Sequence, residues 1–142
     1  MSQLAEKSWP YVFTAILVAG WWWGLKAPFP AASDGLLAAS GGASAVLVGF
    51  LATSKAIILS VSASAVFAKI KNGKYHTLIF DYLYQAIIFG MAFLVVSLLG
   101  FFVDRDPAAP SWFAALWVTL GICSFLLFLR ITRILFKMLK WI

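Results

Sequence analysis

The chain of 142 residues contains one cysteine, Cys123, and one histidine, His76. A single cysteine cannot form a disulfide within the chain, and one cysteine with one histidine cannot build the usual cluster of zinc ligands. Charged residues make up only 11% of the sequence, against about a quarter in an average soluble domain. That is too little charge to cover a water-facing surface, which excludes a soluble enzyme, a disordered linker and a nucleic-acid-binding module.

Residue sets that perform catalysis are also missing. The sequence has no Ser/His/Asp set within reach, no paired carboxylates inside an apolar run and no glycine-rich phosphate loop. We therefore predict no enzyme activity, no cofactor and no metal site.

Apolar residues dominate what is present: 63% of the chain is hydrophobic, including 13 Phe and 7 Trp. Inside a bilayer the backbone must form its hydrogen bonds within a helix or a closed barrel. The apolar runs are continuous and longer than the roughly ten alternating residues of a barrel strand. The sequence therefore predicts an all-α membrane protein that forms a single domain over residues 1–142.

Four apolar runs come close to the length of about 20 residues that a helix needs to cross a membrane. The predicted transmembrane helices cover residues 9–25, 36–66, 78–102 and 111–129. Asn72-Gly73 separates the second helix from the third, which makes the two a long antiparallel hairpin. The run from Asp34 to Lys71 would exceed roughly 50 Å as one helix, so either Gly41-Gly42 breaks it or it projects into the cytoplasm.

The last predicted element is an amphipathic basic tail over residues 130–142. Its four cationic residues are spaced by 3, 4 and 3, which places them on one helical face. They are Arg130, Arg133, Lys137 and Lys140. Such a face favours contact with anionic lipids of the cytoplasmic leaflet.

The distribution of positive charge predicts the orientation in the membrane. Cytoplasmic segments of membrane proteins are enriched in Lys and Arg. With both termini and the turn between the second and third helices in the cytoplasm, eight cationic residues lie inside, and only Lys26 and Arg105 lie outside. The eight are Lys7, Lys69, Lys71, Lys74, Arg130, Arg133, Lys137 and Lys140. We therefore expect both termini in the cytoplasm.

Lys55 interrupts the second apolar run, and its role depends on where that helix begins. A helix starting at Leu36 places Lys55 at the cytoplasmic interface, where a lysine can extend its amine to water. A break at Gly41-Gly42 instead places the amine near the membrane midplane, where it would need a partner or a water-filled cavity. In that second case Lys55 is a candidate pore or buried polar residue, together with Thr53, Ser60 and Ser64.

Small residues recur along the same helix at the spacing of one helical face. Small residues let helix backbones approach closely in lipid, where the hydrophobic effect cannot drive association. The predicted packing residues are Gly41, Ala45, Gly49, Ala52, Ala56 and Ala68. They serve either packing within one chain or an interface between subunits, which in an oligomer could line a narrow pore.

Several short features match a known layout. Asp34-Gly35-Leu36 opens the second helix after an external loop, Lys69-Ile70 ends that long helix, and Tyr75 and Tyr82 enter the third. This layout resembles the RexB-like family of small four-span membrane proteins found in anti-phage systems. The resemblance implies a bacterial inner-membrane protein that permeabilises or depolarises the membrane when a partner senses phage. Lys55 and the basic tail have no counterpart in the resemblance.

The leading functional hypothesis is a homo-oligomeric, pore-forming or membrane-depolarising effector, because four short helices barely enclose a conduit in one subunit. The alternative is a membrane anchor or sensor subunit that recruits a soluble cytoplasmic protein. Recruitment would use the basic tail and the hairpin tip with Lys69, Lys71 and Lys74. A third hypothesis is an accessory subunit of a larger membrane complex.

Overall fold

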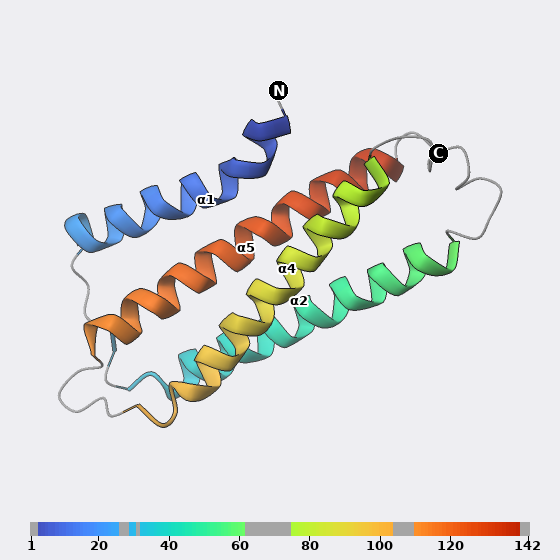
Figure 1. Cartoon of the computed structure of the whole chain (residues 1–142). Helices are drawn as coiled ribbons and strands as arrows, with labels where there is room; N and C mark the ends of the chain where they lie inside the picture. The colour runs from blue at the N-terminus through green and yellow to red at the C-terminus, as the bar shows by residue number, and fades with distance from the viewer. Residues whose placement is uncertain (1–2, 26–28, 31, 62–74, 104–109, 140–142) are drawn as a thin grey trace.

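The computed structural model describes residues 3–25, 29–30, 32–61, 75–103 and 110–139, and every regular element among them is a helix. α1 spans Gln3–Gly20 and continues as a π-helical segment, η1, over Trp21–Leu25. α2 spans Asp34–Val61, α4 spans Tyr75–Leu99 and α5 spans Ser111–Leu139 (Figure 1). The prediction of an all-α chain is confirmed.

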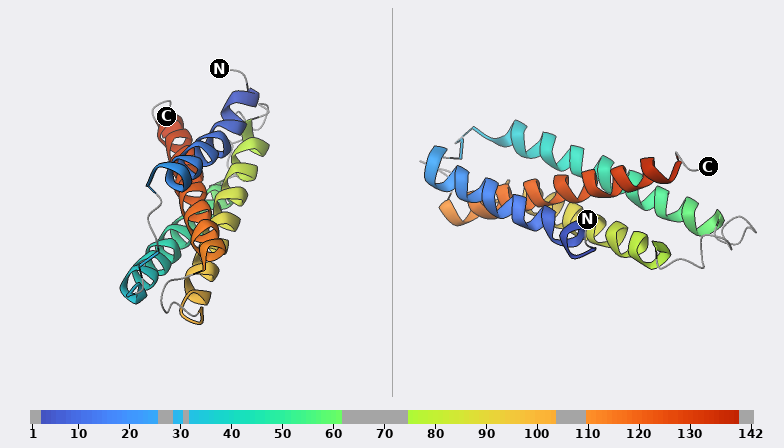
Figure 2. Two further views of the ribbon diagram at one scale, coloured as in Figure 1. Left: turned by 90° about the vertical axis from the view of Figure 1, so that its left-hand side faces the viewer. Right: turned by 90° about the horizontal axis from the view of Figure 1, so that it is seen from above.

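The helices form an elongated bundle in which α4 and α5 pack against each other at the centre. α2 packs on α4, and α1 packs on α5, so each outer helix has one main neighbour (Figures 1 and 2). The start of α1, the end of α2, the start of α4 and the end of α5 lie at the same end of the bundle (Figure 1). We name this end the terminal end.

Three of the described helices are long and apolar enough to cross a membrane: Asp34–Ser60, Leu78–Leu99 and Ser111–Phe136. The chain thus has the helices of a multi-pass membrane protein. α1 is not among the three, because its N-terminal half carries Glu6, Lys7 and the polar residues around them.

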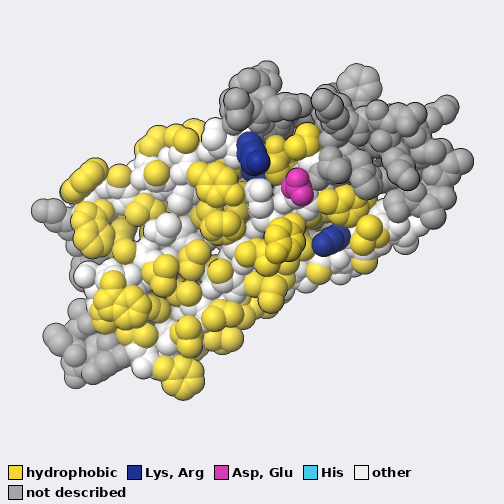
Figure 3. All heavy atoms as spheres, in the orientation of Figure 1, with side chains coloured by type: hydrophobic (Ala, Val, Ile, Leu, Met, Phe, Trp, Pro, Cys, Tyr) yellow, Lys and Arg dark blue, Asp and Glu magenta, His cyan; other side chains and the backbone are white. Residues whose placement is uncertain are grey.

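The exterior of the bundle is apolar. Large hydrophobic side chains stand out from every helix, among them Trp23, Val46 and Phe136. On the face drawn in Figure 3, hydrophobic side chains cover most of the described surface, and the few charged ones lie toward the terminal end. A soluble monomer rarely exposes so large an apolar patch, whereas lipid tails solvate it at no cost.

The helices decide one open alternative and correct one predicted boundary. α2 runs through Gly41 and Gly42 without a break, so the alternative of a helix broken at this point does not apply. α5 does not end at Leu129, and the next two residues, Arg130 and Ile131, are fully buried. The expected surface tail is, up to Leu139, a continuation of the last bundle helix.

Capping residues explain where two of the helices begin. The carbonyl of Ser33 accepts the N–H of Leu37 at 2.9 Å, which starts α2. The carbonyl of Pro110 accepts the N–H groups of Phe113 and Ala114 at 3.0 and 3.2 Å, which starts α5.

Small and hydroxyl residues bring α2 and α4 together. A Cβ on Gly90 would lie 2.6 Å from Cγ2 of Val48, so only glycine permits the observed approach. At the same crossing, Ser44 Oγ donates to the carbonyl of Gly90 at 2.7 Å. One turn before Ser44 and two turns after Gly90, Ser40 and Ser97 are joined by a 3.2 Å hydrogen bond. These polar contacts replace the hydrophobic driving force that lipid cannot supply.

Aromatic packing closes the end opposite the terminal end. Phe29 contacts the rings of Phe113 and Trp117 edge-on, with centroids 5.6 and 5.4 Å apart. Leu37 of α2 is buried in the same cluster. We name this end the aromatic end.

Candidate functional site

Arg130 is the most unusual residue in the bundle. It lies nineteen residues after Ser111, roughly 29 Å along α5, and inside the apolar stretch Ser111–Phe136. Only 2% of its surface is exposed. A charged side chain within a membrane span is costly, and such residues mark functional sites by default.

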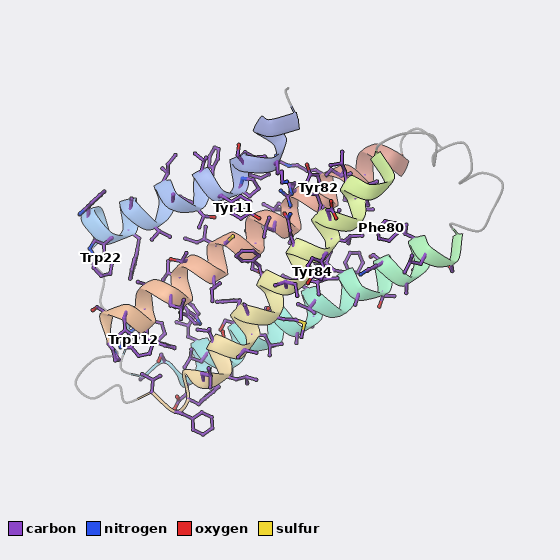
Figure 4. All side chains as sticks on the ribbon, in the orientation of Figure 1. Tyr11, Trp22, Phe80, Tyr82, Tyr84 and Trp112 are labelled. Atoms are coloured by element: carbon purple, nitrogen blue, oxygen red, sulfur yellow. The ribbon has the colours of Figure 1, made fainter. Side chains whose placement is uncertain are left out.

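Two helices, α1 and α4, supply these contacts of the Arg130 guanidinium. Nη2 donates to Oε1 of Gln85 on α4 at 2.8 Å, and Nη1 donates to the carbonyl of Lys7 on α1 at 3.3 Å. Its carbon Cζ lies 3.9 Å from the ring centroid of Tyr82, a close cation–π contact (Figure 4). Oε1 of Gln85 also accepts the hydroxyl of Tyr11 at 3.3 Å. We name these five residues the Arg130 cluster.

Pro10 explains why a helical carbonyl on α1 is open to Arg130. Proline has no N–H, and its ring pushes away the carbonyls of the preceding helical turn. Lys7 belongs to that turn, and α1 bends near its start (Figure 1). Pro10 itself is fully buried, and its carbonyl accepts Oγ1 of Thr14 at 2.7 Å.

The Arg130 cluster contains a fixed positive charge, because an arginine in a protein stays protonated. The amide of Gln85 and the ring of Tyr82 are among the groups that contact it. Among the described residues no three His, Cys, Asp or Glu side chains gather to hold a metal ion. The geometry therefore supports joining α1, α4 and α5 around a permanent cation.

The structure corrects the expected role of Arg130 as a lipid-contacting residue, because its guanidinium points into the bundle. Arg133, one turn further along α5, is exposed, and its Cζ lies 5.8 Å from the ring of Trp9 on α1. Lys69, Lys71, Lys74 and Lys140 lie outside the described residues, as does the side chain of Lys137.

Lys55 is half-buried rather than central to the site. The unbroken α2 places it about 32 Å from Asp34, near the end of the apolar stretch, as in the interfacial alternative. Its Nζ lies 6.0 Å from the ring of Tyr84 on α4.

The expected pore-lining hydroxyls bond to their own helix. Oγ1 of Thr53 donates to the carbonyl of Gly49 at 2.9 Å, and Oγ of Ser60 donates to that of Ile57 at 2.8 Å. Both side chains are exposed, and each satisfies its donor locally. Ser64 lies outside the described residues.

The predicted packing residues of α2 separate into two groups. Gly41 is buried, and a Cβ there would lie 3.7 Å from Cβ of Ser97 on α4. The other described members, Ala45, Gly49, Ala52 and Ala56, are exposed, so they do not pack within the chain. Ala68 lies outside the described residues.

The sequence interpretation missed Tyr11, Tyr82 and Gln85 as members of the site. Gln85 carried a signal, since it is an amide within a long apolar run. The sequence did not distinguish the two tyrosines, because aromatic residues with a polar tip are common in membrane helices.

No known protein family, curated protein or solved structure matches this chain. The function is therefore argued from the geometry of the described residues.

Proposed function

We propose that this chain is a small inner-membrane protein that assembles with copies of itself through α2 and permeabilises or depolarises the membrane. In this proposal α1 with η1 forms a fourth crossing, and both termini lie in the cytoplasm. An even number of crossings fits the start of α1 and the end of α5 lying at the same end of the bundle (Figure 1). The anti-phage role rests on the resemblance in layout to RexB-like proteins.

The observation that carries the proposal is a face of α2 made of small residues and left uncovered by the chain. These residues are Ala38, Gly42, Ala45, Gly49, Ala52 and Ala56, all exposed. Their spacing of 4, 3, 4, 3 and 4 is the heptad spacing along which two helices pair over their whole length. A Cβ added to Gly42 or Gly49 would meet nothing within 4 Å. We name this surface the small-residue face.

A second copy of α2 fits the small-residue face by symmetry. A two-fold interface uses the same surface on both subunits, and small residues allow close approach in lipid. A different face of α2, roughly 100° around the helix, packs on α4 through Ser44 and Leu51. Assembly through the small-residue face therefore leaves the packing of each subunit intact.

A pair of leucine substitutions on α2 tests the proposal. Gly49→Leu places a bulky side chain in the small-residue face, whereas Ala39→Leu adds one at an exposed position outside it. We expect wild type and Ala39→Leu to form the same oligomer in lipid nanodiscs and to dissipate the membrane potential of expressing cells. Gly49→Leu should be monomeric and inactive, with unchanged membrane insertion.

Two outcomes contradict the proposal. An unchanged oligomer in Gly49→Leu would show that α2 does not form the interface. If expression of the wild-type protein left the membrane potential of the cells unchanged, a depolarising effector would be excluded. Loss of a co-purifying soluble protein in Arg133→Gln would instead favour the anchor hypothesis.

A further inference from the structure

A groove of about 500 Å³ lies between α1 and α5. This volume falls in the range of ~300–1,000 Å³ that is typical of sites for small ligands. Its lining is almost wholly apolar and includes Ala15 and Val18 of α1, Leu120 of α5 and Phe89 of α4. Residues at its edge, such as Tyr11, Ala15 and Trp22, are exposed. The groove therefore opens sideways toward the lipid.

The length of the groove matches one leaflet of a bilayer. Tyr11, Ala15 and Val18 follow each other at spacings of 4 and 3 along one face of α1, and Trp22 of η1 lines the same groove four residues later. Tyr11 of α1 and Trp22 of η1 both project toward the side that faces α5 (Figure 4). Eleven residues of helix extend roughly 16 Å, about half of the ~30 Å hydrocarbon thickness.

Each helix that lines the groove carries a polar or cationic group just beyond it, toward the terminal end. On α1, Lys7 precedes Tyr11 by one turn, and on α4, Gln85 precedes Phe89 by one turn. On α5, Arg130 follows Cys123 by two turns. The groove is thus apolar along its length and positively charged at one end.

Two cations are accessible at that end. The side chains of Lys7 and Arg133 are exposed, and Cζ of Arg133 lies 5.8 Å from the ring centroid of Trp9 near the start of α1. Arg130 is fully buried and adds a fixed positive charge. A negatively charged head group beside an apolar chain is complementary to this arrangement.

We propose that the groove binds one acyl chain of an anionic phospholipid and that Lys7 and Arg133 hold the phosphate of its head group. The chain lies along α1 from Tyr11 to Trp22, between α1 and α5. The site is separate from the small-residue face, so it is independent of assembly through α2. It gives α1 a lipid-dependent contact with α5 in addition to the Arg130 cluster.

Spin-labelled lipids test the proposal on the full-length protein. The protein is reconstituted in phosphatidylcholine vesicles with a trace of doxyl-labelled phosphatidylglycerol or doxyl-labelled phosphatidylcholine. The motionally restricted fraction of each label is then measured by electron paramagnetic resonance. We expect a larger restricted fraction for phosphatidylglycerol than for phosphatidylcholine. Equal fractions for the two labels would overturn the proposal.

Matched variants locate the site. Ala15→Phe fills the groove and should abolish the excess for phosphatidylglycerol, whereas Ile16→Phe, at the exposed neighbouring position outside the groove, should retain it. The double variant Lys7→Gln/Arg133→Gln should lower the preference by roughly 25-fold, since each basic residue near an anionic lipid contributes about fivefold. Equal effects of the two phenylalanine variants, or no effect of the charge variant, would overturn the site.

The same measurement on Gly49→Leu separates this proposal from the proposed assembly. A preference retained in Gly49→Leu supports a lipid site within each subunit. A preference lost together with the oligomer would place the lipid between subunits and overturn the assignment to the groove.

Discussion

Arg130 and Lys55 are cations at similar distances from the aromatic end, yet their surroundings differ. Arg130 lies roughly 29 Å along α5 and Lys55 about 32 Å along α2. The arginine is 2% exposed and bonded to α1 and α4. The lysine is half-buried, and its amine lies 6.0 Å from one ring.

The difference follows from how many helices surround each cation. α5 is flanked by α1 and α4, so a residue on its inner face is withdrawn from solvent on several sides. Such a charge is tolerated only when its donors are paired. α2 packs mainly on α4, so Lys55 can extend its amine toward the interface. The position in the bundle, more than the depth, decides whether a cation needs partners.

The largest expected effect is that of Arg130→Ala. The substitution removes two hydrogen bonds and a cation–π contact and leaves a space where α1, α4 and α5 meet. We expect a loss of about 3 kcal/mol in the free energy of unfolding, since each hydrogen bond of a charged group contributes ~1.5–3 kcal/mol. Unfolding in mixed micelles of mild detergent and dodecyl sulfate, followed by circular dichroism, measures it.

Arg130→Lys is the control for charge alone. A lysine keeps the positive charge but lacks the planar fork that reaches both acceptors. Its stability should lie between those of wild type and Arg130→Ala. An Arg130→Ala variant as stable as wild type would show that the cluster does not hold α1 to the bundle.

Gln85→Ala should have an intermediate effect. It removes the acceptor shared by Arg130 and Tyr11 but leaves the Lys7 carbonyl and the Tyr82 ring in place. We expect a loss of about 2 kcal/mol, because a buried donor is left short of one partner. In the Arg130→Ala background the same substitution should cost much less, as a double-mutant cycle of unfolding would show. Additive losses would contradict direct coupling between the two side chains.

The smallest effect is expected for Lys55→Gln. A cation–π contact at an exposed site contributes at most about 1 kcal/mol, and the 6.0 Å separation is at the limit of that interaction. The free energy of unfolding should change by less than ~0.5 kcal/mol under the same conditions. A loss as large as that of Gln85→Ala would mean that Lys55 has a partner inside the bundle.

Much of the fold could be predicted from the sequence because long apolar runs have few structural options in a membrane. The apolar runs predicted the helices, and Ser33 and Asp34 indicated the start of α2. The hairpin predicted for α2 and α4 agrees with their packing. The sequence predicted a helical continuation past Leu129, but not that Arg130 is buried there against α1 and α4. A spacing of 3, 4 and 3 between cations is the same whether the face meets head groups or another helix.

The contacts of the candidate site could not be predicted for a related reason. Tyr11 and Gln85 are 74 residues apart, and no local pattern shows that α1 packs on α5 and reaches α4. Among the described small residues predicted to pack on α2, Gly41 packs within the chain, and the exposed others stay a predicted subunit interface. Periodicity identifies a face, whereas only the neighbouring helices decide what covers that face.

The hydrogen bond from Arg130 to the carbonyl of Lys7 joins residues that are 123 positions apart. During synthesis α1 is made before α5, the helix on which it packs. α1 must therefore remain in the membrane without this partner until α5 has been synthesised. We expect a chain truncated before α5 to leave α1 without its main neighbour and to be degraded faster than the full chain.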